Sequence, residues 1–196
     1  MVLTDKLGIV ADCWNSQSNE PDWTRIRNAN EKLRKQVRNS KYFSIDEEAW
    51  VLDLGCGTKG SEFPRVCQEE FPKTKIILLD NFFGFLKGLN HDAKICADGA
   101  KLPFRSESLE MVFAGHLLHE GIIKDSRWRN DEPYQLVKES YRVLEERGLF
   151  LFTYGESGDD ISTINNLKEI GFKELIHLQR LEFYKGSPTD IYSAIK

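Results

Sequence analysis

The sequence predicts an α/β fold, with a mostly parallel sheet of seven strands, helices on both faces, and an antiparallel hairpin at the C-terminal end. Five short apolar runs alternate with helix-like segments between residues 49 and 170. These runs are almost continuously apolar, which is typical of strands that are covered on both faces. Two further strand-like segments close the chain around the turn signal KGSP at residues 185–188.

Size and composition suit one globular domain. The chain has 196 residues, 40% of them hydrophobic and 30% charged, with a net charge of −4. The apolar run at residues 76–79 is far shorter than the roughly 18 residues of a membrane helix, so no membrane partner is expected. No secretory signal is visible, and the four cysteines lack CxxC spacing, so we expect a reduced, cytoplasmic setting.

The N-terminal 45 residues differ from the rest and are interpreted as a helical lid segment, residues 1–45, that precedes a domain at 46–196. A helix is predicted over 22–41, because Asp22 can cap it and apolar residues share one face. Residues 25–41 hold seven basic residues and one acidic residue, which is either a solvated helix face or a binding patch. Trp14 and Trp23 suit the exclusion of water from a small pocket.

The alternating elements follow in order. Strands are predicted at 49–54, 75–80, 93–98, 109–114 and 148–154, and the tail adds 174–184 and 189–195. Helices are predicted at 61–71, 82–89, 131–146 and 160–170. Gly171 follows the last of these helices and is a good C-terminal stop signal.

A glycine turn follows the first strand, in the segment VLDLGCGTKG at 51–60. Gly55, Gly57 and Gly60 fit the pattern GxGxxG, and Asp80 ends the next strand 20 residues later, as in a dinucleotide site. A nicotinamide-dependent oxidoreductase is therefore one alternative. Asp53 disfavours it, because a carboxylate two residues before the turn would face a pyrophosphate unfavourably.

Three carboxylates end the first three strands: Asp53, Asp80 and Asp98. They line the C-terminal edge of the predicted sheet, where open α/β sheets bind ligands. An acidic, glycine-lined cleft suits a nucleoside that carries positive charge, such as S-adenosylmethionine.

Five stretches occur in a characteristic order: VLDLGCGT at 51–58, LDN at 79–81, ADGAKLPF at 97–104, residues 109–120, and YRVL at 141–144 before GLFLF at 148–152. In order and spacing, from about residue 49 to 195, they resemble the class I S-adenosylmethionine-dependent methyltransferases. The resemblance implies a Rossmann-like fold, S-adenosylmethionine as cofactor and methyl transfer as the reaction. Residues 46–196 would then be the S-adenosylmethionine-binding methyltransferase domain.

The resemblance also implies cofactor contacts in the glycine turn. Asp53 would reach the methionine amino group, while Gly55 and Gly57 would let the backbone approach the ligand. Cys56, between the two glycines, belongs to this set as a small filler of the turn. The family has glycine where this chain has Lys59, so this part of the turn departs from the family pattern.

Further contacts are implied at the next two strand ends. Asp80 would bond both ribose hydroxyls, with Asn81 beside the adenine. Asp98 would accept a hydrogen bond from the adenine amino group, with Gly99 next to it.

The end of the fourth strand supplies the candidates for chemistry. Ala114 and Gly115 would border the methionine and the reacting methyl group. His116 and His119 follow and are candidate general bases, since histidine is the commonest base near neutral pH; packing or loop hydrogen bonding is the alternative for both. A zinc site formed with Glu120 is disfavoured, because the spacing supplies no further paired ligands.

The acceptor is predicted to be a small molecule. Arg127 and Arg129, in a polar loop at 120–133, are either partners of an anionic acceptor or solvated side chains. An RNA methyltransferase that uses the basic N-terminal helix is the alternative, but the chain as a whole is acidic. A non-catalytic interaction module is disfavoured, because clustered carboxylates are costly without a ligand to bond.

Overall fold

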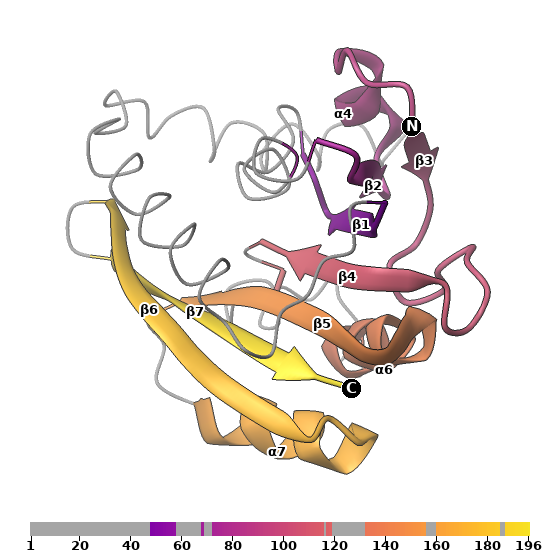
Figure 1. The fold of residues 1–196 in the computed structure, drawn as a ribbon. Helices are drawn as coiled ribbons and strands as arrows, with labels where there is room; N and C mark the ends of the chain where they lie inside the picture. Colours follow the sequence, from indigo (N-terminus) through magenta and orange to yellow (C-terminus); the bar gives the residue numbers. More distant parts are fainter. Residues whose placement is uncertain are drawn as a thin grey trace.

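The computed structural model describes residues 48–57, 68, 72–115, 117–118, 132–155, 160–184 and 187–196. Within these residues seven strands form one sheet in the order β3-β2-β1-β4-β5-β7-β6 (Figure 1). The strands are β1 (Trp50–Leu54), β2 (Lys75–Asp80), β3 (Lys94–Cys96), β4 (Leu109–Ala114), β5 (Leu144–Gly155), β6 (Glu174–Tyr184) and β7 (Ser187–Ile195). The described helices are α4 (Phe83–Lys87), α6 (Glu132–Val143) and α7 (Asp160–Ile170).

The pairing confirms the predicted class of an open, mostly parallel sheet with an antiparallel C-terminal end. The first five strands of the order pair in parallel, and β7 runs antiparallel to both β5 and β6. The chain leaves β1 toward β2 and β3 on one side and returns to β4 on the other. The order therefore reverses between β1 and β4, which is where sheets of this kind bind ligands.

Alternation along β1 divides the core between the two faces of the sheet, since successive side chains point to opposite sides. Leu52 and Leu54 join a buried cluster that includes Leu136 of α6 and Leu167 of α7. Val51 belongs to a second cluster, which includes Leu86 of α4. Helices therefore cover both faces, as predicted.

The junction between α6 and β5 differs from the prediction. The helix expected to reach residue 146 ends at Val143, and Leu144 already pairs with Leu109 of β4. The N–H of Ser108 donates to the carbonyl of Val143 at 2.8 Å, so the residue directly before β4 takes one of the last helical carbonyls. A register shift then separates this first pair from the main β4–β5 ladder.

Helix α7 spans the residues predicted for it. Its end is a Schellman motif, because the N–H of Phe172 donates to Leu167 O at 3.1 Å and that of Gly171 donates to Lys168 O at 3.1 Å. Gly171 has φ = +120°, which confirms it as the stop signal.

Several predicted features lie outside the described residues: the lid segment 1–45 with Trp14 and Trp23, the helix at 61–71 apart from Gln68, and the loop with Arg127 and Arg129. Within the part of the chain that the structure describes, no helix is long and apolar enough to cross a membrane.

Candidate functional site at the C-terminal edge of the sheet

The turn after β1 is held by backbone hydrogen bonds to the end of β2. The N–H groups of Gly55 and Cys56 donate to the carbonyl of Leu79 at 2.8 and 3.1 Å. Gly55 has φ = +71° and Gly57 has φ = +62°. Side chains are disfavoured in this left-handed region, so the turn requires glycine at both positions.

Asp80, at the end of β2, is the central side chain of the site. It is 6% exposed, and its carboxylate accepts the N–H of Gly57 at 3.0 Å and that of Phe82 at 2.9 Å. It therefore ties the glycine turn to the segment after β2. A carboxylate has about four acceptor positions, so these two bonds leave capacity for the hydroxyls of a ligand.

Negative charge collects beneath the turn. Asp53 is fully buried in β1. Burial and the charges of Asp53 and Asp80 together raise the pKa of the Cys56 thiol to about 12. Cys56 therefore stays a protonated thiol at neutral pH, which fits a small filler and excludes a thiolate nucleophile.

The two glycines of the turn differ in their surroundings. A Cβ atom at Gly55 would lie 2.6 Å from Cδ2 of Leu117, whereas one at Gly57 would meet no atom within 4 Å among the described residues. Among the described residues, the space at the Cβ position of Gly57 is therefore open, while the bare backbone of Gly55 accommodates Leu117. No sequence pattern pointed to Leu117, because the contact joins two separate loops.

The third strand end comes to the same edge. The N–H of Ala97 donates to the carbonyl of Asp80 at 3.1 Å, which holds Asp98 near the end of β2. The carboxylate of Asp98 is exposed and accepts the N–H of Ala100 at 2.8 Å. Asn81 is also exposed, and its carbonyl accepts from Cys96 Sγ at 3.7 Å.

Glycine and alanine complete the edge. A Cβ atom at Gly99 would lie 3.2 Å from a methyl of Leu54 and 3.4 Å from one of Leu136, so Gly99 lets the loop approach the core. Ala114 ends β4, fully buried and paired with Leu54, and the partly exposed Gly115 follows it. The cofactor residues predicted from sequence therefore gather at one edge.

The candidate bases His116 and His119 lie outside the described residues, as do Lys59 and Glu120.

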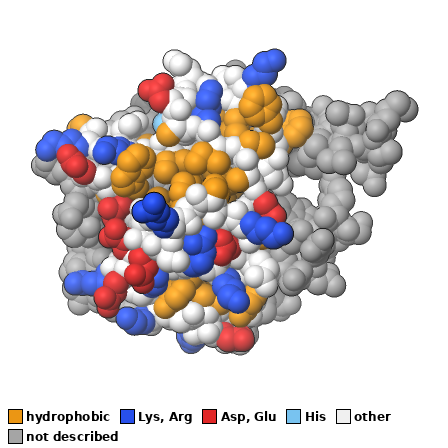
Figure 2. Space-filling model, turned by 90° about the vertical axis from the view of Figure 1, so that its right-hand side faces the viewer, with side chains coloured by type: hydrophobic (Ala, Val, Ile, Leu, Met, Phe, Trp, Pro, Cys, Tyr) orange, Lys and Arg blue, Asp and Glu red, His pale blue; other side chains and the backbone are white. Residues whose placement is uncertain are grey.

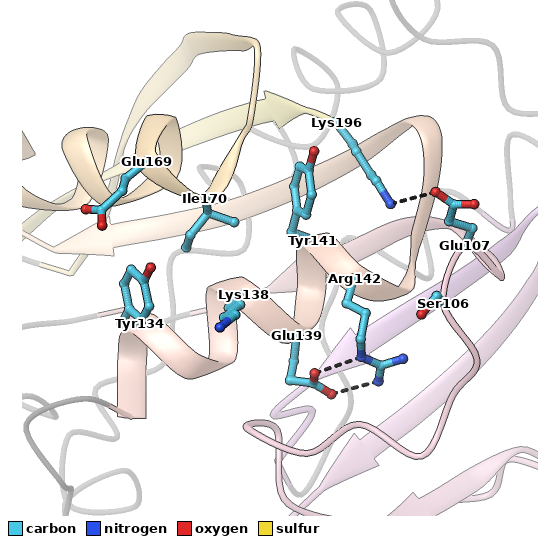
Figure 3. A pocket seen from close by; sticks show the side chains of 10 residues that line it. All are labelled: Ser106, Glu107, Tyr134, Lys138, Glu139, Tyr141, Arg142, Glu169, Ile170 and Lys196. Atoms are coloured by element: carbon cyan, nitrogen blue, oxygen red, sulfur yellow. Dashed lines mark hydrogen bonds and ion pairs between the residues drawn. The ribbon is translucent and has the colours of Figure 1, made fainter.

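The ion pair between Glu139 and Arg142 was not predicted from the sequence. Glu139 and Arg142 on α6 form two hydrogen bonds of 2.8 and 2.7 Å (Figure 3). Both side chains also bind the backbone of the loop before β4. We call this pair the Glu139–Arg142 clamp. The available signal was the spacing of three residues between opposite charges on a helix.

A hollow of about 520 Å³ lies at the other edge of the sheet, between the ends of α6, α7 and β7 (Figure 3). Its lining residues are Ser106, Glu107, Tyr134, Lys138, Glu139, Tyr141, Arg142, Glu169, Ile170 and Lys196. Two ion pairs lie in this lining: Lys196 with Glu107 at 3.3 Å, and Arg142 with Glu139 at 2.7 Å. On the face shown in Figure 2, which is the right-hand side of Figure 1, acidic and basic side chains are interspersed around a hydrophobic patch. The residues that line the hollow include none of the candidate cofactor residues, so the hollow is separate from the candidate site.

Comparison with known proteins identifies the class. Residues 52–152, just over half of the chain, match the family model described as "Methyltransferase domain". The chain belongs to this family, within the class I S-adenosylmethionine-dependent methyltransferases. The matched range runs from β1 into β5 and so includes every described cofactor candidate.

Two curated relatives carry the same name, malonyl-(acyl-carrier protein) O-methyltransferase. The one from Gallionella capsiferriformans (strain ES-2) is 30% identical over 165 residues, covering 76% of this chain and 51% of that protein. The one from Methylovorus sp. (strain MP688) is 28% identical over 116 residues, covering 53% and 36%. The chain thus spans about half of the first relative's length and about a third of the second's.

Solved structures share the fold. A SAM-dependent methyltransferase from Archaeoglobus fulgidus superposes with a TM-score of 0.60 at 15% identity, covering 87% of this chain and 94% of that one. The cyclase SpnF also has a TM-score of 0.60, at 16% identity, covering 84% and 80%. Because a cyclase shares this fold, the fold alone does not define the reaction.

Proposed function

We propose that this protein transfers a methyl group from S-adenosylmethionine to a small-molecule acceptor. The observation that carries the proposal is the convergence of Asp53, Asp80 and Asp98 on one edge of the sheet, around a turn where no described residue fills the space at Gly57. An ammonium and a sulfonium are favoured beside such carboxylates, whereas a pyrophosphate is not. The match to the methyltransferase-domain family supports the same ligand.

Five of the candidate cofactor residues have the following roles in this proposal. The unused acceptor positions of Asp80 take the ribose hydroxyls, and Asn81 lies beside the adenine. Asp98 accepts from the adenine amino group. Asp53 supplies negative charge for the methionine ammonium, and Gly57 allows the ligand close to the backbone.

The chemistry requires positioning more than covalent help. S-adenosylmethionine, when bound, supplies a methyl group on a sulfonium, which is already a good leaving group. Ala114 and Gly115 border the reacting centre, and their small size leaves room for the acceptor in line with the transferred carbon. A base is needed only for an acceptor that arrives protonated, and His116 is the first candidate, followed by His119.

We further propose an oxygen nucleophile on the acceptor, because both curated relatives are named as O-methyltransferases. Arg127 and Arg129 would pair with an anionic acceptor. The lid segment 1–45 would close over it and exclude water. The described cysteines Cys56 and Cys96 are free thiols, in keeping with a reduced, cytoplasmic setting.

Calorimetry with S-adenosylhomocysteine and NAD tests the cofactor. We expect S-adenosylhomocysteine to bind and NAD to show no comparable affinity. Asp80→Asn should weaken binding by roughly 1.5–3 kcal/mol, typical for hydrogen bonds to a charged group. Binding of NAD alone would overturn the methyltransferase proposal.

The role of His116 is tested by His116→Ala, with turnover and S-adenosylhomocysteine affinity measured side by side. A general base predicts a loss of turnover of about 10²-fold or more with almost unchanged affinity. Unchanged turnover would assign His116 to packing instead.

A further inference from the structure

We propose that the Glu139–Arg142 clamp is a positioning pair that lets the nucleoside site distinguish adenine from other bases, by fixing the loop that carries Asp98. The inference rests on the proposed function, because it takes Asp98 as the partner of the adenine amino group. Neither clamp residue lies at the cofactor edge, so the effect is indirect.

The clamp binds the loop at three backbone atoms. Arg142 Nη1 donates to the carbonyl of Phe104 at 2.9 Å, and Nη2 donates to that of Leu102 at 3.0 Å. In the opposite direction, the N–H of Leu102 donates to Glu139 Oε2 at 2.9 Å. Both backbone polar groups of Leu102 are therefore held by α6.

The pair itself is preorganised for this task. Arg142 Nε and Nη2 donate to the two oxygens of Glu139 at 2.8 and 2.7 Å, a two-bond contact that fixes the guanidinium plane (Figure 3). The side chains are only 34% and 20% exposed. The same contact lowers the pKa of Glu139, so the carboxylate stays charged at neutral pH.

A hydrogen-bonded turn at residues 98–101 joins Asp98 to Leu102, the residue that the clamp holds. The carbonyl of Asp98 accepts the N–H of Lys101 at 3.0 Å, and its carboxylate accepts the N–H of Ala100 at 2.8 Å. Leu102 follows directly and is 4% exposed. Because Asp98 is itself exposed, packing does not orient its carboxylate. The turn does so, and the clamp holds the far end of that turn.

A base-reading role follows from the chemistry of the carboxylate. It accepts hydrogen bonds only, so it favours the amino group of adenine and disfavours the carbonyl that hypoxanthine carries at the same position. A hydrogen bond of this kind requires close placement, whereas contacts with the ribose and methionine portions do not pass through this loop. Loosening the clamp should therefore reduce base discrimination more than general affinity.

The test compares Kd values for S-adenosylhomocysteine and S-inosylhomocysteine by calorimetry. The variants are Arg142→Lys, which lacks the planar fork, and Glu139→Gln, which loses the charged contact. Glu107→Gln is the matched control, because the Glu107 side chain lines the same hollow and pairs with Lys196. Its backbone N–H donates to the carbonyl of Arg142 at 3.0 Å, and the substitution keeps that bond because it changes the side chain alone. Thermal unfolding checks that each variant is folded at the temperature of the titration.

For the wild type and the control we expect clear preference for the adenine ligand. In both clamp variants the ratio of the two Kd values should fall by roughly 3- to 30-fold, the range for residues that act on a site without contacting it. A purely structural role would weaken both ligands in parallel and leave the ratio unchanged, which would overturn the inference.

Two wild-type results separate this inference from the proposed function. If S-adenosylhomocysteine binds but the inosine analogue binds equally well, the inference fails while the methyltransferase proposal stands. If neither ligand binds, the proposed function fails and the inference fails with it.

Discussion

Gly55 and Gly57 show how one motif assigns different tasks to residues two positions apart. Both have a positive φ, so both are required by the backbone. Leu117 crowds Gly55, whereas no atom of the described residues lies within 4 Å of the Cβ position at Gly57. Stability should therefore depend more on Gly55, and ligand binding more on Gly57.

Alanine substitutions separate these tasks. Gly57→Ala should cost roughly 1–2 kcal/mol from backbone strain, together with a loss of S-adenosylhomocysteine affinity. Gly55→Ala should incur the same backbone strain and, in addition, lose ~1–3 kcal/mol of stability from overpacking against Leu117. Urea unfolding measures both, and in the double variant Leu117→Ala should recover part of the loss at Gly55. Equal unfolding free energies for the two glycine variants would contradict the assignment.

Cys56 gives a second prediction at this scale. It is 5% exposed and its pKa is raised to about 12, so almost none of it is thiolate at pH 8. Alkylation with iodoacetamide at pH 8 should therefore modify the exposed Cys96 and spare Cys56 in the folded protein. Peptide mass mapping reads the two sites, and both should react in urea. Rapid modification of Cys56 without denaturant would show that the turn is open.

The glycine that follows α7 is more constrained than the glycine that follows α4. Gly171 combines φ = +120° with a close neighbour, since a Cβ atom there would lie 2.9 Å from the hydroxyl of Tyr141. Gly88, after α4, has φ = −84° and no atom within 4 Å of its Cβ position among the described residues. The two glycines are thus a matched pair with opposite expected effects.

We expect Gly171→Ala to destabilise the protein by at least about 1–2 kcal/mol, because the backbone is strained and Tyr141 must move. Gly88→Ala should stabilise by about 0.4–1 kcal/mol, since it restricts the unfolded chain at no native cost. The midpoints of urea unfolding for the two variants and the wild type measure both effects. A loss at Gly88 equal to that at Gly171 would argue against this account of the helix end.

The clamp on α6 makes stability depend on pH. Its hydrogen bond to Arg142 lowers the pKa of Glu139 below the ordinary value of 4.5. A carboxyl with a lowered folded pKa stabilises the protein fully above its unfolded pKa and loses that contribution as pH falls through the folded value. Glu139→Gln should thus be less stable than wild type at pH 7, and the difference between their unfolding free energies should become smaller below pH 4.5. Unfolding in urea across this range tests it, and a constant gap would contradict it.

For the whole molecule, the two edges of the sheet have different electrostatic character. The C-terminal edge brings together Asp53, Asp80 and Asp98, while the N-terminal edge pairs its charges across the hollow. Every described cofactor candidate lies between residues 53 and 115. Cofactor binding should therefore be independent of the lid segment 1–45, and turnover should depend on it.

Deletion of residues 1–40 tests this division. We expect the shortened protein to retain S-adenosylhomocysteine binding and to lose methyl transfer, because the proposed lid would be absent and the acceptor would be exposed to water. The intact protein should show no salt-sensitive affinity for RNA. Micromolar RNA binding that falls steeply with salt and disappears on deletion would favour an RNA acceptor instead.

Local sequence patterns were sufficient to predict much of the secondary structure of this protein. Continuous apolar runs predicted the strands, and Gly171 predicted the end of α7, because these signals depend on neighbours in the chain. The position of Asp53, Asp80 and Asp98 at one edge was also predictable, because parallel strands bring their carboxyl ends together. In detail, Asp80 ends β2, Asp53 is the last but one residue of β1, and Asp98 lies two residues beyond the end of β3.

Tertiary structure decided what depends on distant segments. It placed β7 between β5 and β6, ended α6 at Val143 where Ser108 takes its carbonyl, and set Leu117 against Gly55. It also joined the Glu139–Arg142 clamp to backbone atoms 37 to 40 residues away in the chain. Such contacts have no local signature, because each side chain finds its partner only after the sheet has brought separate loops together.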